Sequence, residues 1–119
     1  MTFDVAIDQR DSFIRVTLSG APSIGQVLSL IHLLGVESET WQQQTVLVDL
    51  RGVATPFTRT DQARIGEDAA ASLSLMDRIA SVVPAERITR VSERAARRNG
   101  INVCVFDDEI AAIAWLREG

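Results

Sequence analysis

The sequence predicts an α/β fold, because short apolar runs alternate along the chain with segments of helical spacing. Three such runs, at 46–50, 79–83 and 101–105, are each followed by a turn signal and then by apolar residues with a helical repeat. Before them, apolar and polar residues alternate at 3–8 and at 14–18, as in the half-buried strands of an antiparallel hairpin. This order predicts a mixed sheet of four to five strands, led by a hairpin and accompanied by about four helices.

The first helix is predicted at 24–36, with Ser23 as its N-cap. One apolar face of this helix consists of Ile24, Val27, Leu28, Ile31 and Leu34. Leu30 widens this stripe, whereas Leu33 lies nearly opposite to it. A leucine on the far side is either incidental or part of a contact with a second copy of the chain. The second interpretation, with Trp41 at the end of the surface, predicts a homodimer through helix 24–36.

The middle of the chain reads as a buried strand, a loop and a second helix. The near-continuous apolar run 45–50 is typical of a central strand that is covered on both faces. The loop 51–57 follows, and Thr58 or Thr60 is expected to begin the helix. Thr58 and Asp61 have the spacing of a capping box.

The last third of the chain repeats the pattern. A third helix is predicted at 86–98, ended by a Schellman-type turn at Asn99–Gly100. The last strand is expected at 101–106. Asp107 is expected to cap the C-terminal helix, whose acidic first turn suits the positive end of the helix dipole.

The composition indicates one domain, predicted to span residues 1–119. Of the 119 residues 46% are hydrophobic, which is enough for one core without a metal or a disulfide. Cys104 is the only cysteine, so an internal disulfide is excluded and a reducing compartment is favoured. The first residues lack the basic start and apolar run of a secretion signal, so we expect a cytoplasmic location.

Several functional classes are disfavoured by residue types that the sequence lacks. The net charge of −4 argues against nucleic acid as a partner. All 12 basic residues are arginine and there is no tyrosine, which excludes a Schiff-base lysine, a Walker-type lysine and a tyrosine acid in this chain. One histidine and one cysteine cannot assemble a zinc site, and no metal or cofactor is predicted. The longest apolar stretch is too short and mixed for an integral membrane segment.

Three stretches together resemble a known family. They are 46–50 before a variable loop, 77–83 after a helix, and Val105-Phe106-Asp107-Asp108-Glu109 running into Ala112-Ile113-Ala114-Trp115-Leu116. With the order of elements, they resemble the STAS fold of anti-sigma-factor antagonists, and more closely its SpoIIAA-like branch, sometimes grouped with lipid-binding Sec14-type domains. The resemblance implies a non-catalytic regulatory or binding module that acts through a protein partner or a small apolar, lipid-like ligand.

The sequence departs from this family at the residue that is phosphorylated. The antagonists carry a serine in an Asp-Ser-Ser-Gly-like element at the start of the helix after the third strand. Here the region reads Pro56-Phe57-Thr58-Arg59-Thr60-Asp61, so Thr58 and Thr60 are only positional analogues. A phosphate on either would meet free N–H groups at the helix start, but an ordinary N-cap is the preferred interpretation.

The candidate binding residues lie where the third and fifth strands are expected to end, at the edge where open α/β sheets bind ligands. They are Asp49, Arg51, Phe57, Thr58, Thr60 and Asp107. An enzyme that uses Asp49, Asp107 or Thr58 at this edge is the alternative, although no nucleophile or metal ligand accompanies the two carboxylates. The preferred interpretation is that Asp107 caps a helix and Asp49 bonds loop amides. A binding surface or pocket is then expected around the first helix and the loop 51–57.

Arginines crowd the predicted third helix. Spacings of three and four place Arg87, Arg90, Arg94 and Arg97 along one side of it. Such a face could meet an acidic partner or, as a peripheral contact, the anionic headgroups of a membrane. Because two glutamates stand at i,i+4 from these arginines, a solvated face is the preferred interpretation.

Overall fold

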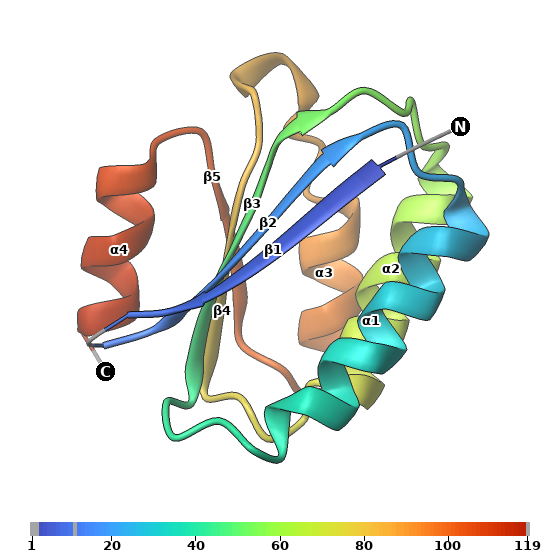
Figure 1. Ribbon diagram of the computed structural model, residues 1–119. Helices are drawn as coiled ribbons and strands as arrows, with labels where there is room; N and C mark the ends of the chain where they lie inside the picture. The colour runs from blue at the N-terminus through green and yellow to red at the C-terminus, as the bar shows by residue number, and fades with distance from the viewer. Residues whose placement is uncertain (1–2, 11, 119) are drawn as a thin grey trace.

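The computed structural model describes residues 3–10 and 12–118, and its centre is a five-stranded sheet (Figure 1). The strands lie across the sheet in sequence order: β1 (Phe3–Gln9), β2 (Ile14–Gly20), β3 (Thr45–Val53), β4 (Arg78–Val82) and β5 (Val103–Phe106). β1 is antiparallel to β2, whereas β2, β3, β4 and β5 run parallel. The carboxyl ends of four strands therefore lie at one edge of the sheet.

Helices cover both faces of the sheet. α1 (Ile24–Ser38), α2 (Arg59–Ser72) and α3 (Val91–Arg98) lie on one face, and α4 (Glu109–Arg117) lies on the other (Figure 1). The first three are the crossover segments that parallel neighbours require, because a tight turn cannot return the chain to the same end of the sheet.

Two apolar layers hold the helices to the sheet, since successive strand residues point to opposite faces. The layer under α1, α2 and α3 includes Ile14, Val16, Val46, Ile79 and Val103. The layer under α4 includes Leu47, Ala80, Val82, Ala112 and Leu116. The central strands are therefore buried on both faces, which explains why their sequences are near-continuous apolar runs.

The predicted fold class is confirmed: a hairpin leads into a mixed sheet, and four α-helices follow in the described part of the chain. The predicted caps of α1 and α2 are also present. Ser23 Oγ accepts a hydrogen bond from the Gln26 amide at 3.1 Å, and Thr58 Oγ1 accepts one from the Asp61 amide at 3.1 Å. The Schellman-type stop is confirmed by Gly100, whose φ is 93°.

The prediction of a helix at 86–98 was wrong in its first half. Residues Ala85–Arg87 form one 3₁₀ turn, Ile88 is extended, and Arg90 has a left-handed backbone with φ 62° before α3 begins at Val91. The i,i+4 charge pairs that favoured a longer helix contribute only about 0.2–0.5 kcal/mol each. Tertiary contacts of the arginines outweigh them, as described below.

Three smaller corrections concern strand and helix ends. β1 is exposed rather than half-buried, because it is the outer strand of the sheet and none of its residues belongs to the two apolar layers under the helices. β3 continues to Val53, so the first residues of the predicted loop 51–57 are strand. The N-cap of α4 is Asp108 rather than Asp107, since the Asp108 carboxylate accepts from the Ile110 amide at 3.2 Å.

Candidate functional site: an apolar cavity at the carboxyl edge of the sheet

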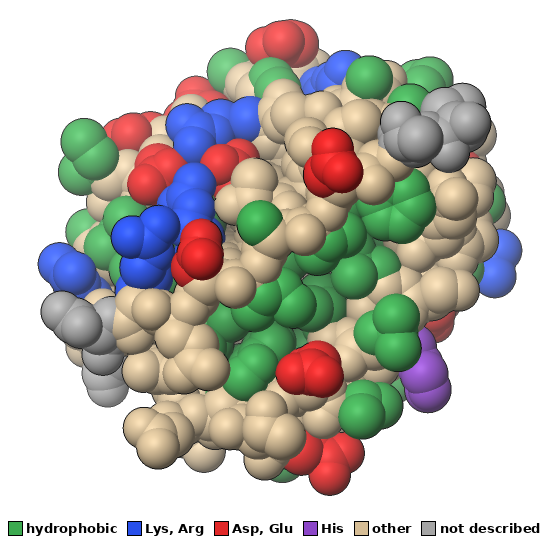
Figure 2. Space-filling model, in the orientation of Figure 1, with side chains coloured by type: hydrophobic (Ala, Val, Ile, Leu, Met, Phe, Trp, Pro, Cys, Tyr) green, Lys and Arg blue, Asp and Glu red, His purple; other side chains and the backbone are tan. Residues whose placement is uncertain are grey.

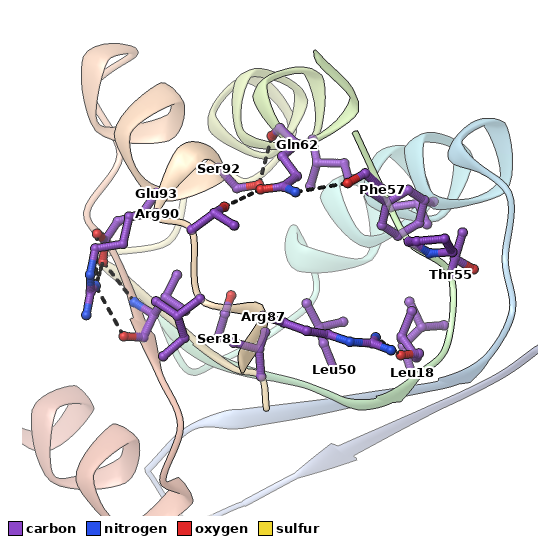
Figure 3. Close-up of a pocket in the computed structure, with 18 residues that line it drawn as sticks. Leu18, Leu50, Thr55, Phe57, Gln62, Ser81, Arg87, Arg90, Ser92 and Glu93 are labelled. Carbon is purple, nitrogen blue, oxygen red and sulfur yellow. Dashed lines mark hydrogen bonds and ion pairs between the residues drawn. The ribbon is translucent and has the colours of Figure 1, made fainter. Parts of the chain in front are cut away.

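A cavity of about 400 Å³ lies between the carboxyl ends of the strands and the helices α1, α2 and α3. Its apolar lining comes from the sheet, the helices and the loops that follow β3 and β4: Leu18, Val27, Leu50, Val53, Pro56, Phe57, Ile65, Val83, Ile88 and Val105. Figure 3 shows Phe57 and Gln62 on one side of the space and Leu18, Leu50 and Ser81 on the other. Both the size and the mainly apolar lining are typical of small-molecule sites.

Hydrogen bonds between the surrounding segments hold the walls of the cavity in place. Gln62 of α2 donates to the Phe57 carbonyl at 3.0 Å and contacts Thr89 of the loop before α3. Ser92 of α3 donates to the Gln62 carbonyl at 2.7 Å. Arg87 reaches from the loop after β4 to the carbonyl of Val53 at the end of β3. The two loops at the mouth are thus fixed to each other and to α2 and α3.

Glu93 is the one acidic side chain in the lining, and its charge is compensated. It is 8% exposed and lies within 3.1 Å of the Arg90 guanidinium. Its Oε1 also accepts a hydrogen bond from the Val105 amide at 2.9 Å. A buried carboxylate needs such partners, so Glu93 fastens α3 to β5 rather than offering a free base.

The residues that the sequence proposed for binding divide between two faces of the sheet. Phe57, Arg87 and Arg90 line the cavity. Thr58 and Thr60 are exposed at the start of α2, where Thr58 serves as the N-cap. Phosphorylation of either threonine, like a binding role for them, stays a prediction.

Asp49 lies on the opposite face, in a cluster of four charges that we call the ion quartet: Arg15, Asp49, Arg51 and Glu109. Arg15 Nη2 lies 2.8 Å from Asp49 Oδ2 and 3.0 Å from Glu109 Oε1. Arg51 Nη2 lies 2.8 Å and 2.7 Å from the same two oxygens. The quartet joins β2 and β3 to the first turn of α4, and its charges balance.

The quartet stabilises both of its carboxylates in the ionised form. Hydrogen bonds from the Arg51 guanidinium hold the pKa of Asp49 below its ordinary value of 3.8, against the opposing effect of burial. A hydrogen bond from Arg15 likewise holds the pKa of Glu109 below its ordinary value of 4.5. Proton transfer at neutral pH is most efficient when the pKa of the carboxyl group lies near 7, so a lowered pKa does not favour either group as a general acid or base. Asp49 also accepts from the Arg51 amide at 3.1 Å, which is the structural role that the sequence favoured. Asp107 is exposed beyond the end of β5.

The four arginines of the predicted basic helix face do not share a helix, so that face was a wrong prediction. Arg87 and Arg90 precede α3 and bond the residues named above, whereas Arg94 and Arg97 belong to α3. Arg97 Nε donates to the Val103 carbonyl at 2.7 Å. Contact of these arginines with an acidic partner or with anionic headgroups stays a prediction, although it cannot use one continuous helical face.

Sequence reasoning missed most of the polar and loop residues that shape the cavity, among them Gln62, Ser81, Ile88 and Ser92. Ser81 offered the clearest signal, because it interrupts an otherwise apolar strand on the face toward α1, α2 and α3. The sequence does not identify Ile88, because its spacing predicts one helix over residues 86–98.

Cys104 lies on β5 and is partly buried. Burial raises the pKa of the Cys104 thiol, as expected for a small residue of an apolar strand, and the Glu93 carboxylate adds to this shift.

Across residues 3–10 and 12–118, every helix is too short or too polar to span a membrane.

No family model matches the sequence, and no curated protein matches it. Solved structures that resemble the chain include an anti-sigma factor antagonist from Mycobacterium paratuberculosis, at 12% identity and a TM-score of 0.67, with 98% of this chain and 95% of that chain covered. They also include an uncharacterized protein from the DUF3478 family with a SpoIIAA-like fold from Shewanella loihica PV-4, at 16% identity and a TM-score of 0.58, with 96% and 93% covered. The chain therefore has the STAS-type, SpoIIAA-like fold that its residue patterns predict.

Proposed function

We propose that the chain is a non-catalytic, cytoplasmic binding module of regulatory type, and that the cavity takes up a small apolar ligand. The observation that carries this proposal is the apolar lining of a 400 Å³ space at the carboxyl edge of a parallel sheet. The lining includes Val27 of the first helix and Phe57 of the following loop, the two segments around which the sequence predicts a binding pocket. The anti-sigma factor antagonist with the same fold supports a regulatory role.

Filling the cavity should abolish ligand binding without unfolding the protein. Ser81 lies on β4 with its side chain toward the space, so Ser81→Phe places a ring where the ligand would lie. We expect wild-type protein to bind decanol, a ten-carbon alcohol, in isothermal titration calorimetry, and the Ser81→Phe protein to give no saturable heat.

Ser74→Phe is the matched control, because Ser74 is exposed and lies outside the cavity lining. It should bind decanol like wild type. Ile88→Trp, which blocks the space from the loop, provides a second variant if Ser81→Phe does not fold. Wild-type protein that binds no decanol, or a folded blocking variant that binds as tightly as wild type, would contradict the proposal.

A second surface supports contact with a protein, which we propose is another copy of the chain. Figure 2 shows apolar side chains gathered in a hollow between β1 and α1. Val5 and Ile7 are exposed on β1, and Leu33 and Val36 are exposed on α1. Trp41, expected at the end of this surface, instead packs on the core. A contiguous exposed apolar patch is typical of an association site.

Light scattering after gel filtration tests the homodimer. We expect wild-type protein to elute as a dimer, and Leu33→Glu to give a monomer, because Leu33 is 61% exposed and a charge there opposes apolar contact. Ile110, 78% exposed on α4 at the opposite face of the sheet, provides the control variant Ile110→Glu, which should remain dimeric. A wild-type monomer at high concentration would contradict this part of the proposal.

A further inference from the structure

The charged groups around the cavity leave one positive charge without a carboxylate partner. Arg90 is paired with Glu93 at 3.1 Å, so these two charges cancel. Arg87 donates to the carbonyl of Val53, an uncharged acceptor. Among the ion pairs of residues 3–10 and 12–118 none involves Arg87. The lining of an acidic protein thus has a local charge of +1.

Arg87 is also placed where it can meet a ligand. Its side chain runs along the cavity wall beside Leu50, toward Leu18 (Figure 3). Its methylenes therefore contact the apolar space while the guanidinium lies at the rim. A guanidinium has five N–H donors in a planar fork that fits a carboxylate or a phosphate, and the Val53 carbonyl accepts from only one of its nitrogens.

The volume limits the length of the ligand. If each non-hydrogen atom occupies about the 30 Å³ that a water molecule takes in the liquid, 400 Å³ holds about a dozen such atoms. A ten-carbon acyl chain with a small headgroup has this size. Long-chain lipids with eighteen carbons would extend well beyond the rim.

We propose that the cavity selects a medium-length acyl chain with an anionic headgroup, held at the rim by Arg87. The proposal rests on the proposed function, since it assumes that the apolar space takes up the chain. The guanidinium donors that the Val53 carbonyl leaves free can form two parallel N–H···O bonds to a headgroup anion of opposite charge, which the hydroxyl of a neutral alcohol cannot offer.

Calorimetry with decanol, decanoate and decyl phosphate at pH 7 tests the headgroup. We expect wild-type protein to bind the better of the two anions about tenfold more tightly than decanol, the effect expected for a hydrogen bond to a charged group. Arg87→Gln should remove this preference. Because Arg87 also bonds the Val53 carbonyl, its effect is measured as the ratio of anion to decanol affinity within the same variant. Arg87→Lys, which keeps the charge, should restore part of it. The ratio between decanoate and decyl phosphate then identifies the headgroup as carboxylate or phosphate.

Arg94→Gln is the matched control, because Arg94 is exposed on α3 outside the lining and its loss changes the net charge equally. It should retain the preference for anions. If wild type binds decanol and the anions equally, or if Arg87→Gln weakens all three alike, the inference about the headgroup is wrong while apolar binding stands. If none of the three binds, both this inference and the proposed function are wrong.

Discussion

Replacing Gly66 with alanine is expected to lower the free energy of unfolding by about 2 kcal/mol, because an overpacking cost of about 3 kcal/mol is only partly offset by the better helix propensity of alanine. Gly66 lies in α2 where the backbone of α3 approaches closely. A Cβ atom there would overlap the Ser92 carbonyl oxygen and lie 2.9 Å from the Ala95 Cβ. Backbone atoms cannot swing aside as a flexible side chain can, so the two helices must separate. The gain of about 1 kcal/mol that alanine normally brings to a helix is smaller than this cost.

Gly25→Ala is the matched control for this prediction. Gly25 is also helical, but the nearest atom to a Cβ there is the Ser23 Oγ at 3.9 Å, an ordinary contact. We expect this variant to be as stable as wild type or more stable, by up to about 1 kcal/mol. Urea denaturation measures both. Equal changes in the free energy of unfolding for the two substitutions would contradict the close approach of α2 and α3 at Gly66. Because Ser92 also lines the cavity, Gly66→Ala should weaken ligand binding as well.

Replacing Asp49 with asparagine should also lower the free energy of unfolding by about 3 kcal/mol at pH 7. The side chains of Asp49 and Arg15 are 9% and 14% exposed, so removing the carboxylate leaves a largely buried arginine with one anionic partner instead of two. Breaking one side of a buried pair typically costs about 3–5 kcal/mol. The lower end applies here, because Arg51 is 44% exposed and can turn toward water.

The pH dependence of the stability lost in Asp49→Asn shows whether the loss comes from the charge of Asp49 or from its packing. The pKa values of Asp49 and Glu109 are lowered in the folded protein, so their ionisation stabilises it above their ordinary values of 3.8 and 4.5. This stabilisation is lost as the pH falls through the lower, folded values. The difference in the free energy of unfolding between wild type and Asp49→Asn should therefore be constant from pH 7 to about pH 5. It should shrink below about pH 4.

Asp107→Asn is the control for Asp49→Asn. Asp107 is an exposed aspartate that follows β5, whereas Asp49 lies on β3. We expect it to change the free energy of unfolding by less than about 0.5 kcal/mol, as most exposed substitutions do. An Asp49→Asn protein as stable as wild type, or a deficit that is the same at pH 7 and at pH 3, would contradict the role given to the ion quartet.

The fold could be predicted because its determinants are local. Doubly covered strands have near-continuous apolar sequences, and Ser23, Thr58 and Gly100 mark helix ends through bonds to residues three to five positions away. The loop before α3 could not be predicted in this way. Its conformation depends on the bonds of Arg87 to Val53 and of Arg90 to Glu93 and Val105, and the partners of these bonds include residues from other strands.

The candidate site could be predicted in its position but not in its chemistry. The order of elements predicts a binding site at the carboxyl edge of a parallel sheet, and Phe57 is one of the residues that it proposes there. Asp49 was assigned to the same edge, yet it faces α4, because alternate residues of β3 point to opposite sides and its partners Arg15 and Glu109 come from distant segments. Pairing across a sheet of this kind becomes visible only once the register is known.

The most direct test of the central claim, that the cavity binds an apolar chain, is nuclear magnetic resonance of methyl-labelled protein titrated with decanol and decanoate. We predict saturable shifts and ligand contacts at the methyl groups of Val27, Ile65, Ile88 and Val105, which line the cavity from four segments. The methyl groups of Leu47 and Leu116, in the layer under α4, should not contact the ligand. Ligand contacts confined to exposed side chains such as Ile7 and Leu33, or no saturable shift with either ligand, would contradict the claim.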